Sequence, residues 1–217
     1  MRNVLNNIGK YLLNFVAFLA MGLVIGLICG FVGTVFHECI SFAVGLRASN
    51  TWIIYLLPLG GFAIAALYKV TNKPVTTDHV IKSIIDEKPI SIVMAPLIFV
   101  STVVTQLVGG SGGREGAAIQ LGGCLGYNIG KLVRLNGREL KIITRCGISA
   151  VFAAMFQTPL GATLFAMEVV DVGHLYYIDL IPCLASALTA STLAGFLGTE
   201  SGIPKLAQVP AFSIANM

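Results

Sequence analysis

A long apolar stretch runs from Tyr11 to Phe36 without one charged residue. A helix needs roughly 20 apolar residues to cross the hydrocarbon core of a bilayer, so this stretch is long enough to span it. It is also too long for the apolar part of a signal peptide, and no convincing cleavage site follows. Only 11% of the 217 residues are charged, against about 25% in a typical soluble domain. We therefore expect a membrane protein with several spans.

Further along the chain, full-length apolar stretches alternate with shorter or interrupted ones. The expected helices cover 11–45, 52–70, 76–85, 92–108, 115–133, 140–156, 160–170 and 176–197, and a loop follows over 198–217. The segment 76–85 is too polar to face lipid, and 160–170 is too short to cross the bilayer alone. Short or irregular elements at membrane depth must be buried in protein or line a cavity. This mixture favours a channel or carrier with broken helices over a simple bundle.

Basic residues gather between positions 131 and 145. They are Lys131, Arg134, Arg138, Lys141 and Arg145, against Glu139 alone. Short loops rich in Lys and Arg mark the cytoplasmic side of a membrane protein. We therefore expect a multi-pass protein of the cell membrane, with this linker and the N-terminus in the cytoplasm. Nucleic-acid binding is not expected, because these residues join two apolar helices rather than forming a solvated basic domain.

Glycines recur at every fourth position in two of the expected helices. They are Gly22, Gly26 and Gly30 in the first, and Gly122, Gly126 and Gly130 in another. This spacing places glycines on one helix face and lets a second backbone approach closely. The five cysteines share no metal-ligand spacing, and we interpret them as small apolar residues. No metal, cofactor or nucleophile–base pair is expected, and the chain is not predicted to be an enzyme.

Residues 109–116 read Gly-Gly-Ser-Gly-Gly-Arg-Glu-Gly and precede an apolar helix. Glycines leave backbone N–H groups accessible. A helix that begins here directs its unpaired N–H groups and the positive end of its dipole towards the same place. These features predict an anion site made of backbone, at Gly113, Arg114, Gly116 and Ala117. Such a site binds without a full positive charge, so it can also release the anion, as conduction requires.

Glu115 lies within this segment. A carboxylate at a helix N-terminus is itself a good occupant of an anion site, so we expect Glu115 to block the site when ionised and to leave it when protonated. Ionisable residues at membrane depth are functional candidates. The alternative is a helix-capping carboxylate paired with Arg114 at the membrane surface. A P-loop is excluded, because no Gly-Lys-Ser/Thr ends the segment.

Residues 113–116, Gly-Arg-Glu-Gly, resemble the Gly-Lys/Arg-Glu-Gly-Pro filter motif of the CLC chloride channel and transporter family. Residues 147–161 resemble that family's next helix pair with its Phe-Asn-Ala/Thr-Pro-Leu-like turn, and 165–168 resemble the end of the short helix that follows. The resemblance implies an all-α membrane fold with full spans and short broken helices. It also implies chloride or fluoride as the transported ion, Glu115 as the gate, and helix N-termini near 76 and 115 directed at bound anions.

Several positions depart from the family pattern. Ala117 stands where the common motif has proline, and Gly-Gly-Ser precedes the motif at 109–111, which is closer to the fluoride-transporting branch. Val169 follows Glu168, where chloride/proton exchangers of the family carry a second, inner glutamate. These departures leave a channel and a fluoride/proton exchanger both open.

The family's Gly-Ser-Gly-Ile-Pro motif has no match at its usual place near 75–79. Thr77, Asp78 and His79 stand there as the possible inner filter. Asp78 would repel an anion unless its side chain faces away. A Ser-Gly-Ile-Pro string does occur at 201–204, after the last helix, and we interpret it as a coincidental loop sequence.

The family builds its pathway from two inverted halves, and this chain resembles one. Inverted repeats place the transport site at the interface between the halves. We therefore expect membrane lipid and a second CLC-like half as partners, the latter either a separate chain or a missing segment, and a homodimer of complete units. A hypothesis of another class is a non-transporting membrane assembly subunit or fragment, whose glycine faces serve only association.

Overall fold

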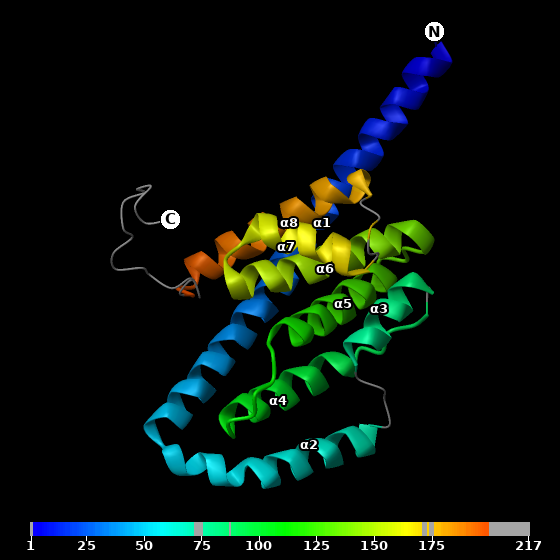
Figure 1. Ribbon diagram of the computed structural model, residues 1–217. Helices are drawn as coiled ribbons and strands as arrows, with labels where there is room; N and C mark the ends of the chain where they lie inside the picture. The colour runs from blue at the N-terminus through cyan, green and yellow to red at the C-terminus, as the bar shows by residue number, and fades with distance from the viewer. Residues whose placement is uncertain (1, 72–75, 87, 171–172, 174–175, 200–217) are drawn as a thin grey trace, which may run out of the picture.

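The structure is a computed structural model that describes residues 2–71, 76–86, 88–170, 173 and 176–199, with side chains from Phe15 onward. Within these ranges every regular element is helical, which confirms the all-α prediction. The elements are α1 (Arg2–Ser49), the 3₁₀ helix η1 (Thr51–Leu56), α2 (Leu57–Thr71), α3 (Thr77–Ile85), α4 (Met94–Leu107), α5 (Glu115–Leu132), α6 (Gly137–Phe156), α7 (Pro159–Val170) and α8 (Tyr177–Phe196) (Figure 1). Most of the loop expected over 198–217, including 201–204, lies outside the described residues.

Three stretches of the described chain are long and apolar enough to cross a membrane. They are Phe15–Ser49, Thr51–Thr71 and Tyr177–Phe196. The first helix is longer than the predicted 11–45, since it begins at Arg2 and ends at Ser49. The span predicted over 92–108 is shorter than expected, because α4 has only 14 residues. At about 1.5 Å per residue, α4 falls well short of the bilayer core.

The helix α6 lies at the centre of the fold, packed against α1, α5, α7 and α8. Its sequence from Leu140 to Met155 is almost entirely buried, because small and branched apolar side chains face neighbours on every side. Four of the cysteines, Cys29, Cys124, Cys146 and Cys183, are buried in this core. This burial agrees with their interpretation as small apolar residues.

Glycines bring two pairs of helices into close contact, as their spacing predicts. A β-carbon on Gly122 of α5 would lie 2.5 Å from the carbonyl oxygen of Gly147 in α6. In the same way, a β-carbon on Gly26 of α1 would lie 2.6 Å from the carbonyl oxygen of Ser186 in α8. Only glycine leaves room for backbones at this separation, so the packing of α5 on α6 and of α1 on α8 depends on these residues.

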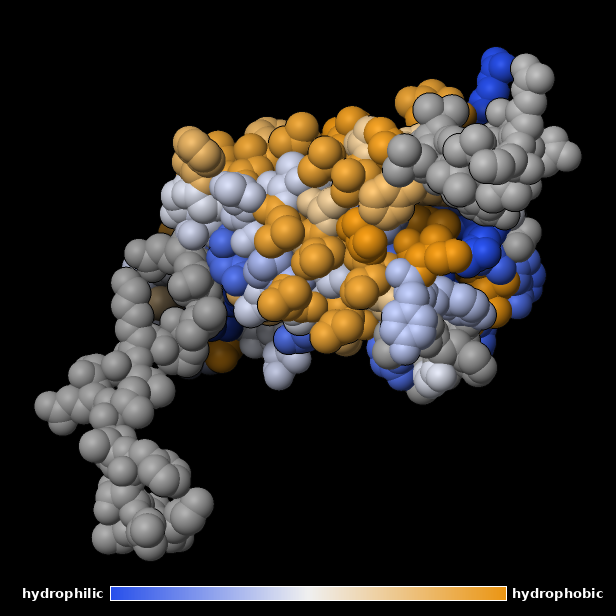
Figure 2. Space-filling view, turned by 90° about the horizontal axis from the view of Figure 1, so that it is seen from above, coloured by the Kyte–Doolittle hydropathy of each residue, from blue (hydrophilic) through white to orange (hydrophobic). Residues whose placement is uncertain are grey.

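The outer surface of α7 and α8 is apolar. Figure 2 shows hydrophobic side chains spread across the face of the molecule that these helices form. The exposed large residues there include Leu160, Leu164, Ile178, Ile181 and Leu188. An apolar surface of this extent fits lipid or another membrane subunit rather than water.

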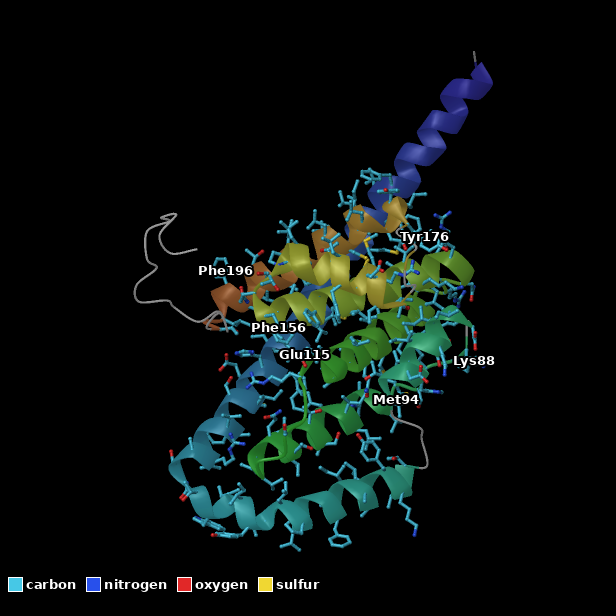
Figure 3. The ribbon with its side chains drawn as sticks, viewed as in Figure 1. Lys88, Met94, Glu115, Phe156, Tyr176 and Phe196 are labelled. Atoms are coloured by element: carbon cyan, nitrogen blue, oxygen red, sulfur yellow. The ribbon has the colours of Figure 1, made fainter. Side chains whose placement is uncertain are left out.

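One end of the helix bundle is basic. The C-terminal ends of α3, α5 and α7 and the N-terminal ends of α6 and α8 lie on this side, and the N-terminal end of α1 projects beyond them (Figure 1). Lys88 and Tyr176 mark this end in Figure 3. Its basic residues include Lys82, Lys88, Lys131, Arg134, Arg138 and Lys141. We call this the basic end. By the rule that Lys and Arg accumulate inside, its cytoplasmic location stays a prediction.

Candidate functional site

The connection between α4 and α5 begins with a helix stop. Gly109 has φ of +88°, a left-handed conformation that glycine adopts without strain. The N–H of Gly110 then donates to the carbonyl of Thr105 at 2.8 Å, which closes the last turn of α4. This turn redirects the chain from α4 towards the start of α5.

A side chain from α4 holds the next part of the connection. Nε2 of Gln106 donates to the carbonyl oxygen of Gly112 at 2.6 Å. Gln106 is buried, whereas Gly112 is exposed, so the bond ties the surface of the connection to the interior. The carbonyl of Gly112 is thereby occupied, and the chain passes to the first turn of α5 in a fixed position.

The N-terminus of α5 presents backbone N–H groups. The first helical hydrogen bond runs from the N–H of Ala118 to the carbonyl of Arg114 at 3.0 Å. The N–H groups of Glu115, Gly116 and Ala117 precede it and have no acceptor within the helix. No side chain caps this turn. These donors and the positive end of the helix dipole are the features from which the sequence predicts an anion site, and that site stays a prediction.

The Glu115 side chain folds back over the start of its own helix. A β-carbon on Gly113 would lie only 2.7 Å from Oε2 of Glu115, so the carboxylate rests against the Gly113 backbone. Arg114 takes part in none of the ion pairs formed by the described residues. The pairing of Glu115 with Arg114 that a surface cap requires is therefore not formed.

A hollow of about 400 Å³ opens beside Glu115. Its lining includes Gln106, Gly112, Gly113, Arg114 and Glu115, with His37 from α1 and Met155 and Phe156 from α6. Figure 3 shows Glu115 near Phe156, at the end of α6 remote from the basic end. The hollow therefore joins the α4–α5 connection to α1 and α6.

His37 lines the hollow, but nothing in the sequence marks it as a site residue. It is a single histidine in an apolar helix, with no motif around it. In the structure it is 9% exposed, and its Nδ1 has no hydrogen-bond partner. Because it is buried, has an unpartnered nitrogen and lines the same hollow as Glu115, His37 is a candidate for proton exchange with that carboxylate.

The N-terminus of α3 meets the same turn of α5. Thr76 caps α3, because its Oγ1 accepts from the N–H of His79 at 3.2 Å. Oγ1 of Thr77 accepts from Nε2 of Gln120 in α5 at 2.7 Å, and it would lie 3.0 Å from a β-carbon on Gly116. Two helix N-termini thus converge near Gly116, and Thr77 is the residue that joins them.

The other two possible inner filter residues lie elsewhere. The carboxylate of Asp78 is paired with Nζ of Lys82 at 2.7 Å, and its side chain is 69% exposed. None of the three residues Thr77, Asp78 and His79 is among those that line the hollow beside Glu115. Asp78 therefore faces away from the α5 N-terminus, which removes the repulsion that its charge would cause.

Comparisons with known proteins place the chain in a family. A family model described as "Voltage gated chloride channel" matches residues 68–217. A chloride/fluoride channel protein of Pseudomonas syringae pv. tomato is 35% identical over 210 residues, which cover 94% of this chain and 46% of that protein. An uncharacterized protein of Methanocaldococcus jannaschii is 24% identical over 190 residues, 86% of this chain and 46% of that protein.

Solved structures have the same fold. A CLC-type fluoride/proton antiporter aligns with a TM-score of 0.78 and 32% identity, covering 92% of this chain and 51% of the antiporter. A slow cyanobacterial Cl⁻/H⁺ antiporter aligns with a TM-score of 0.68 and 19% identity, covering 89% and 50%. The chain spans about half the length of each of these proteins. With a family model that matches most of its residues, the chain belongs to the voltage gated chloride channel family.

Proposed function

We propose that this chain forms one side of a transmembrane anion pathway, gated by the carboxylate of Glu115. The observation that carries the proposal is the position of that carboxylate, folded over Gly113 beside the unpaired N–H groups of α5. An ionised Glu115 occupies the place of an anion. Protonation removes the charge that the N-terminus of α5 attracts, so the side chain is then free to leave. His37 and Arg114 are the other titratable groups that line the hollow. No enzymatic activity is part of the proposal.

Fluoride is the favoured ion, with chloride as the alternative. The relative with 35% identity is described as a chloride/fluoride channel protein, and the structure with 32% identity is a fluoride/proton antiporter. The chloride/proton antiporter is only 19% identical. Val169, in place of an inner glutamate, also departs from chloride/proton exchangers, as the family resemblance implies.

A second CLC-like half is needed to complete the pathway. The Glu115 side chain is exposed in this chain, and the hollow beside it is open. A second, inverted half packed over this surface would enclose the anion between helix N-termini from both sides. We further propose that complete units pair as homodimers, as the family resemblance implies.

The alternative, a subunit that serves only assembly, is less well supported. It assigns Gly122 and Gly126 to association with other chains. Both glycines already contact α6 of the same chain, where β-carbons would lie 2.5 Å from Gly147 O and 2.8 Å from Ile143 O. These faces are therefore not available to a partner.

The test uses a chimera in which this chain is joined to the part of the Pseudomonas syringae relative that it does not match. The chimera is reconstituted in liposomes, and fluoride and chloride efflux are recorded with ion-selective electrodes. We expect fluoride efflux that rises as the pH falls, and a Glu115→Gln variant whose efflux no longer depends on pH. Glu139→Gln, an exposed carboxylate in the first turn of α6, is the matched control and should behave as the parent.

Two outcomes would count against the proposal. A chimera that is folded and inserted but passes neither ion would exclude the transport function. A Glu115→Gln variant with the same rate and pH dependence as the Glu139→Gln control would exclude Glu115 as the gate.

A further inference from the structure

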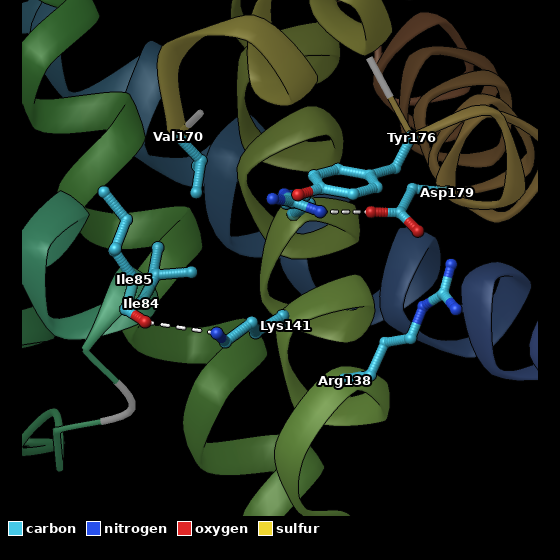
Figure 4. Close-up of a pocket in the computed structure, with 8 residues that line it drawn as sticks. Ile84, Ile85, Arg138, Lys141, Val170, Tyr176 and Asp179 are labelled. Atoms are coloured by element: carbon cyan, nitrogen blue, oxygen red, sulfur yellow. Dashed lines mark hydrogen bonds and ion pairs between the residues drawn. The ribbon is translucent and has the colours of Figure 1, made fainter. Parts of the chain in front are cut away.

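A second cavity lies at the basic end, far along α6 from the Glu115 hollow. Its volume is about 360 Å³, it is partly open, and it is lined by the ends of α3 and α7, the first turns of α6 and the start of α8. The lining residues are Ile84, Ile85, Arg138, Lys141, Arg145, Val170, Tyr176 and Asp179 (Figure 4). Anion transport, as proposed above, makes no use of this cavity.

Three basic side chains of α6 face this cavity. Arg138, Lys141 and Arg145 are three and four residues apart, so they lie on one face of the helix. Lys141 donates from Nζ to the carbonyl of Ile85 at 3.1 Å. Figure 4 shows Arg138 extending towards Asp179, whereas Lys141 extends the other way, towards Ile85. The cavity therefore combines three cations with a single carboxylate among its lining residues.

The deep end of the cavity is a buried ion pair. NH1 of Arg145 binds Oδ2 of Asp179, and their side chains are 8% and 1% exposed. The ring of Tyr176 lies over the guanidinium, with its centroid 5.2 Å from Cζ. Nε of Arg145 and Oδ1 of Asp179 are buried without hydrogen-bond partners. Buried polar atoms of this kind normally have a partner, so a ligand in the cavity would offer an acceptor to Nε of Arg145 and a donor to Oδ1 of Asp179.

The helices that line the cavity also expose apolar side chains. Tyr177, Ile178 and Ile181 of α8 are 80%, 60% and 44% exposed, and Ile85 on the α3 side is 49% exposed. Tyrosines beside basic residues are typical of the interface between the hydrocarbon and the head groups. A free anion would use only the charges, whereas a phospholipid would also cover this apolar surface with its acyl chains.

We propose that this cavity binds the head group of an anionic phospholipid. The phosphate lies between Arg138 and Lys141 and within reach of Arg145, and the acyl chains follow the exposed face of α8. Basic pockets between membrane helices bind anionic head groups in this way. The site lies in the leaflet that faces the basic end, and it does not depend on anion transport.

The test is lipid binding to the full chain in neutral detergent, measured by native mass spectrometry. The probes are phosphatidylglycerol, phosphatidylcholine and glycerol 3-phosphate. We expect phosphatidylglycerol to bind at least about tenfold more tightly than phosphatidylcholine, since each Lys or Arg near an anionic lipid adds about fivefold. Glycerol 3-phosphate, which lacks acyl chains, should not displace the lipid at equal concentration.

Two double variants distinguish the effect of charges in the cavity from the effect of charges elsewhere on the chain. R138Q/K141Q removes two cavity charges and should weaken phosphatidylglycerol binding about 25-fold. R134Q/K69Q removes two exposed charges that do not line the cavity and should weaken it less than about threefold. Arg138 is itself exposed, so the single variant Arg138→Gln, with about a fivefold loss, serves if the double variant does not fold.

Three results would overturn the proposal. Equal affinity for phosphatidylglycerol and phosphatidylcholine would remove the charge requirement. Equal losses of affinity in R138Q/K141Q and R134Q/K69Q would exclude the cavity as the lipid-binding site. Binding of glycerol 3-phosphate as tight as that of the lipid would make this a site for free phosphate.

Discussion

Oε2 of Glu115 lies so close to Gly113 that a β-carbon on that glycine would be only 2.7 Å away. Gly113 is not among the glycines with positive φ, so its backbone conformation does not require glycine. Glycine is required at this position because the Glu115 carboxylate needs the space. The absence of a side chain at position 113 is thus what allows Glu115 to rest over the N-terminus of its own helix.

Gly113→Ala tests this relationship in the chimera. The new methyl group should displace the Glu115 carboxylate and leave the N–H groups of α5 accessible, so we expect faster fluoride efflux at neutral pH. The contact is with the far end of a flexible side chain, so unfolding should change by less than about 1 kcal/mol. Efflux from liposomes and denaturant unfolding measure the two effects.

Gly45→Ala is the control for that variant, because a β-carbon there meets nothing within 4 Å. It should transport as the parent does. Efflux that becomes slower in Gly113→Ala, with Gly45→Ala unchanged, would show that the carboxylate is not the obstacle to conduction.

Thr77 and Asp78 are neighbours with different predicted effects on transport. Thr77→Val removes the hydroxyl that binds Gln120 and faces Gly116, so we expect an efflux at least about threefold slower and a changed fluoride-to-chloride ratio. Asp78→Asn alters an exposed carboxylate paired with Lys82, so efflux should stay within about twofold of the parent. The measurement is efflux of each ion from liposomes of matched protein content. A larger effect for Asp78→Asn than for Thr77→Val would place the inner filter on the other side of α3.

The features that could be predicted from the sequence are those set by local pattern. Hydropathy located the helices, and the spacing of glycines predicted which helix faces come close together. The glycine-rich segment predicted a helix N-terminus at Glu115, where α5 begins. The end of α4 at Leu107 was predicted within one residue, because the glycines that start at Gly109 end the helix, whereas its start at Met94 lies two residues later than expected.

Long-range contacts could not be predicted in the same way. His37 reaches the hollow because α1 packs beside α6, and no residue near His37 in the sequence indicates that packing. The contact of Thr77 with Gly116 likewise depends on how α3 docks on α5. The outward direction of Asp78 could have been predicted, since Lys82 follows it four residues later and such pairs form along the helix surface.

Gly122→Ala tests the close packing of α5 on α6. Its methyl group would meet the carbonyl oxygen of Gly147, a backbone atom that cannot move aside without moving the helix. We expect a loss of about 1–3 kcal/mol in the free energy of unfolding, measured by denaturant titration in mixed micelles. Gly195→Ala in α8 is the matched control, because a β-carbon there meets nothing within 4 Å, and it should be neutral or slightly stabilising. Equal stabilities of the two variants would mean that α5 and α6 separate at little cost.

The buried pair of Arg145 and Asp179 joins α6 to α8. Removal of Arg145 alone should destabilise the fold, whereas removal of both charges should not. Arg145→Met leaves the carboxylate of Asp179 buried without its partner, so we expect a loss of about 3–5 kcal/mol in the free energy of unfolding. The double variant Arg145→Met/Asp179→Leu removes both charges and should recover most of that loss, because a buried ion pair and a well-packed apolar pair are similar in stability.

Lys82→Met is the comparison for an exposed pair. Its partner Asp78 keeps its access to water, with both side chains more than 60% exposed, so the free energy of unfolding should stay close to that of the parent. Denaturant unfolding in the same micelles measures all three variants. If the double variant were as unstable as Arg145→Met alone, the cost would come from lost packing against Tyr176 and not from an uncompensated charge. Recovery in the double variant would instead identify Asp179 as the buried charge that Arg145 is required to neutralise.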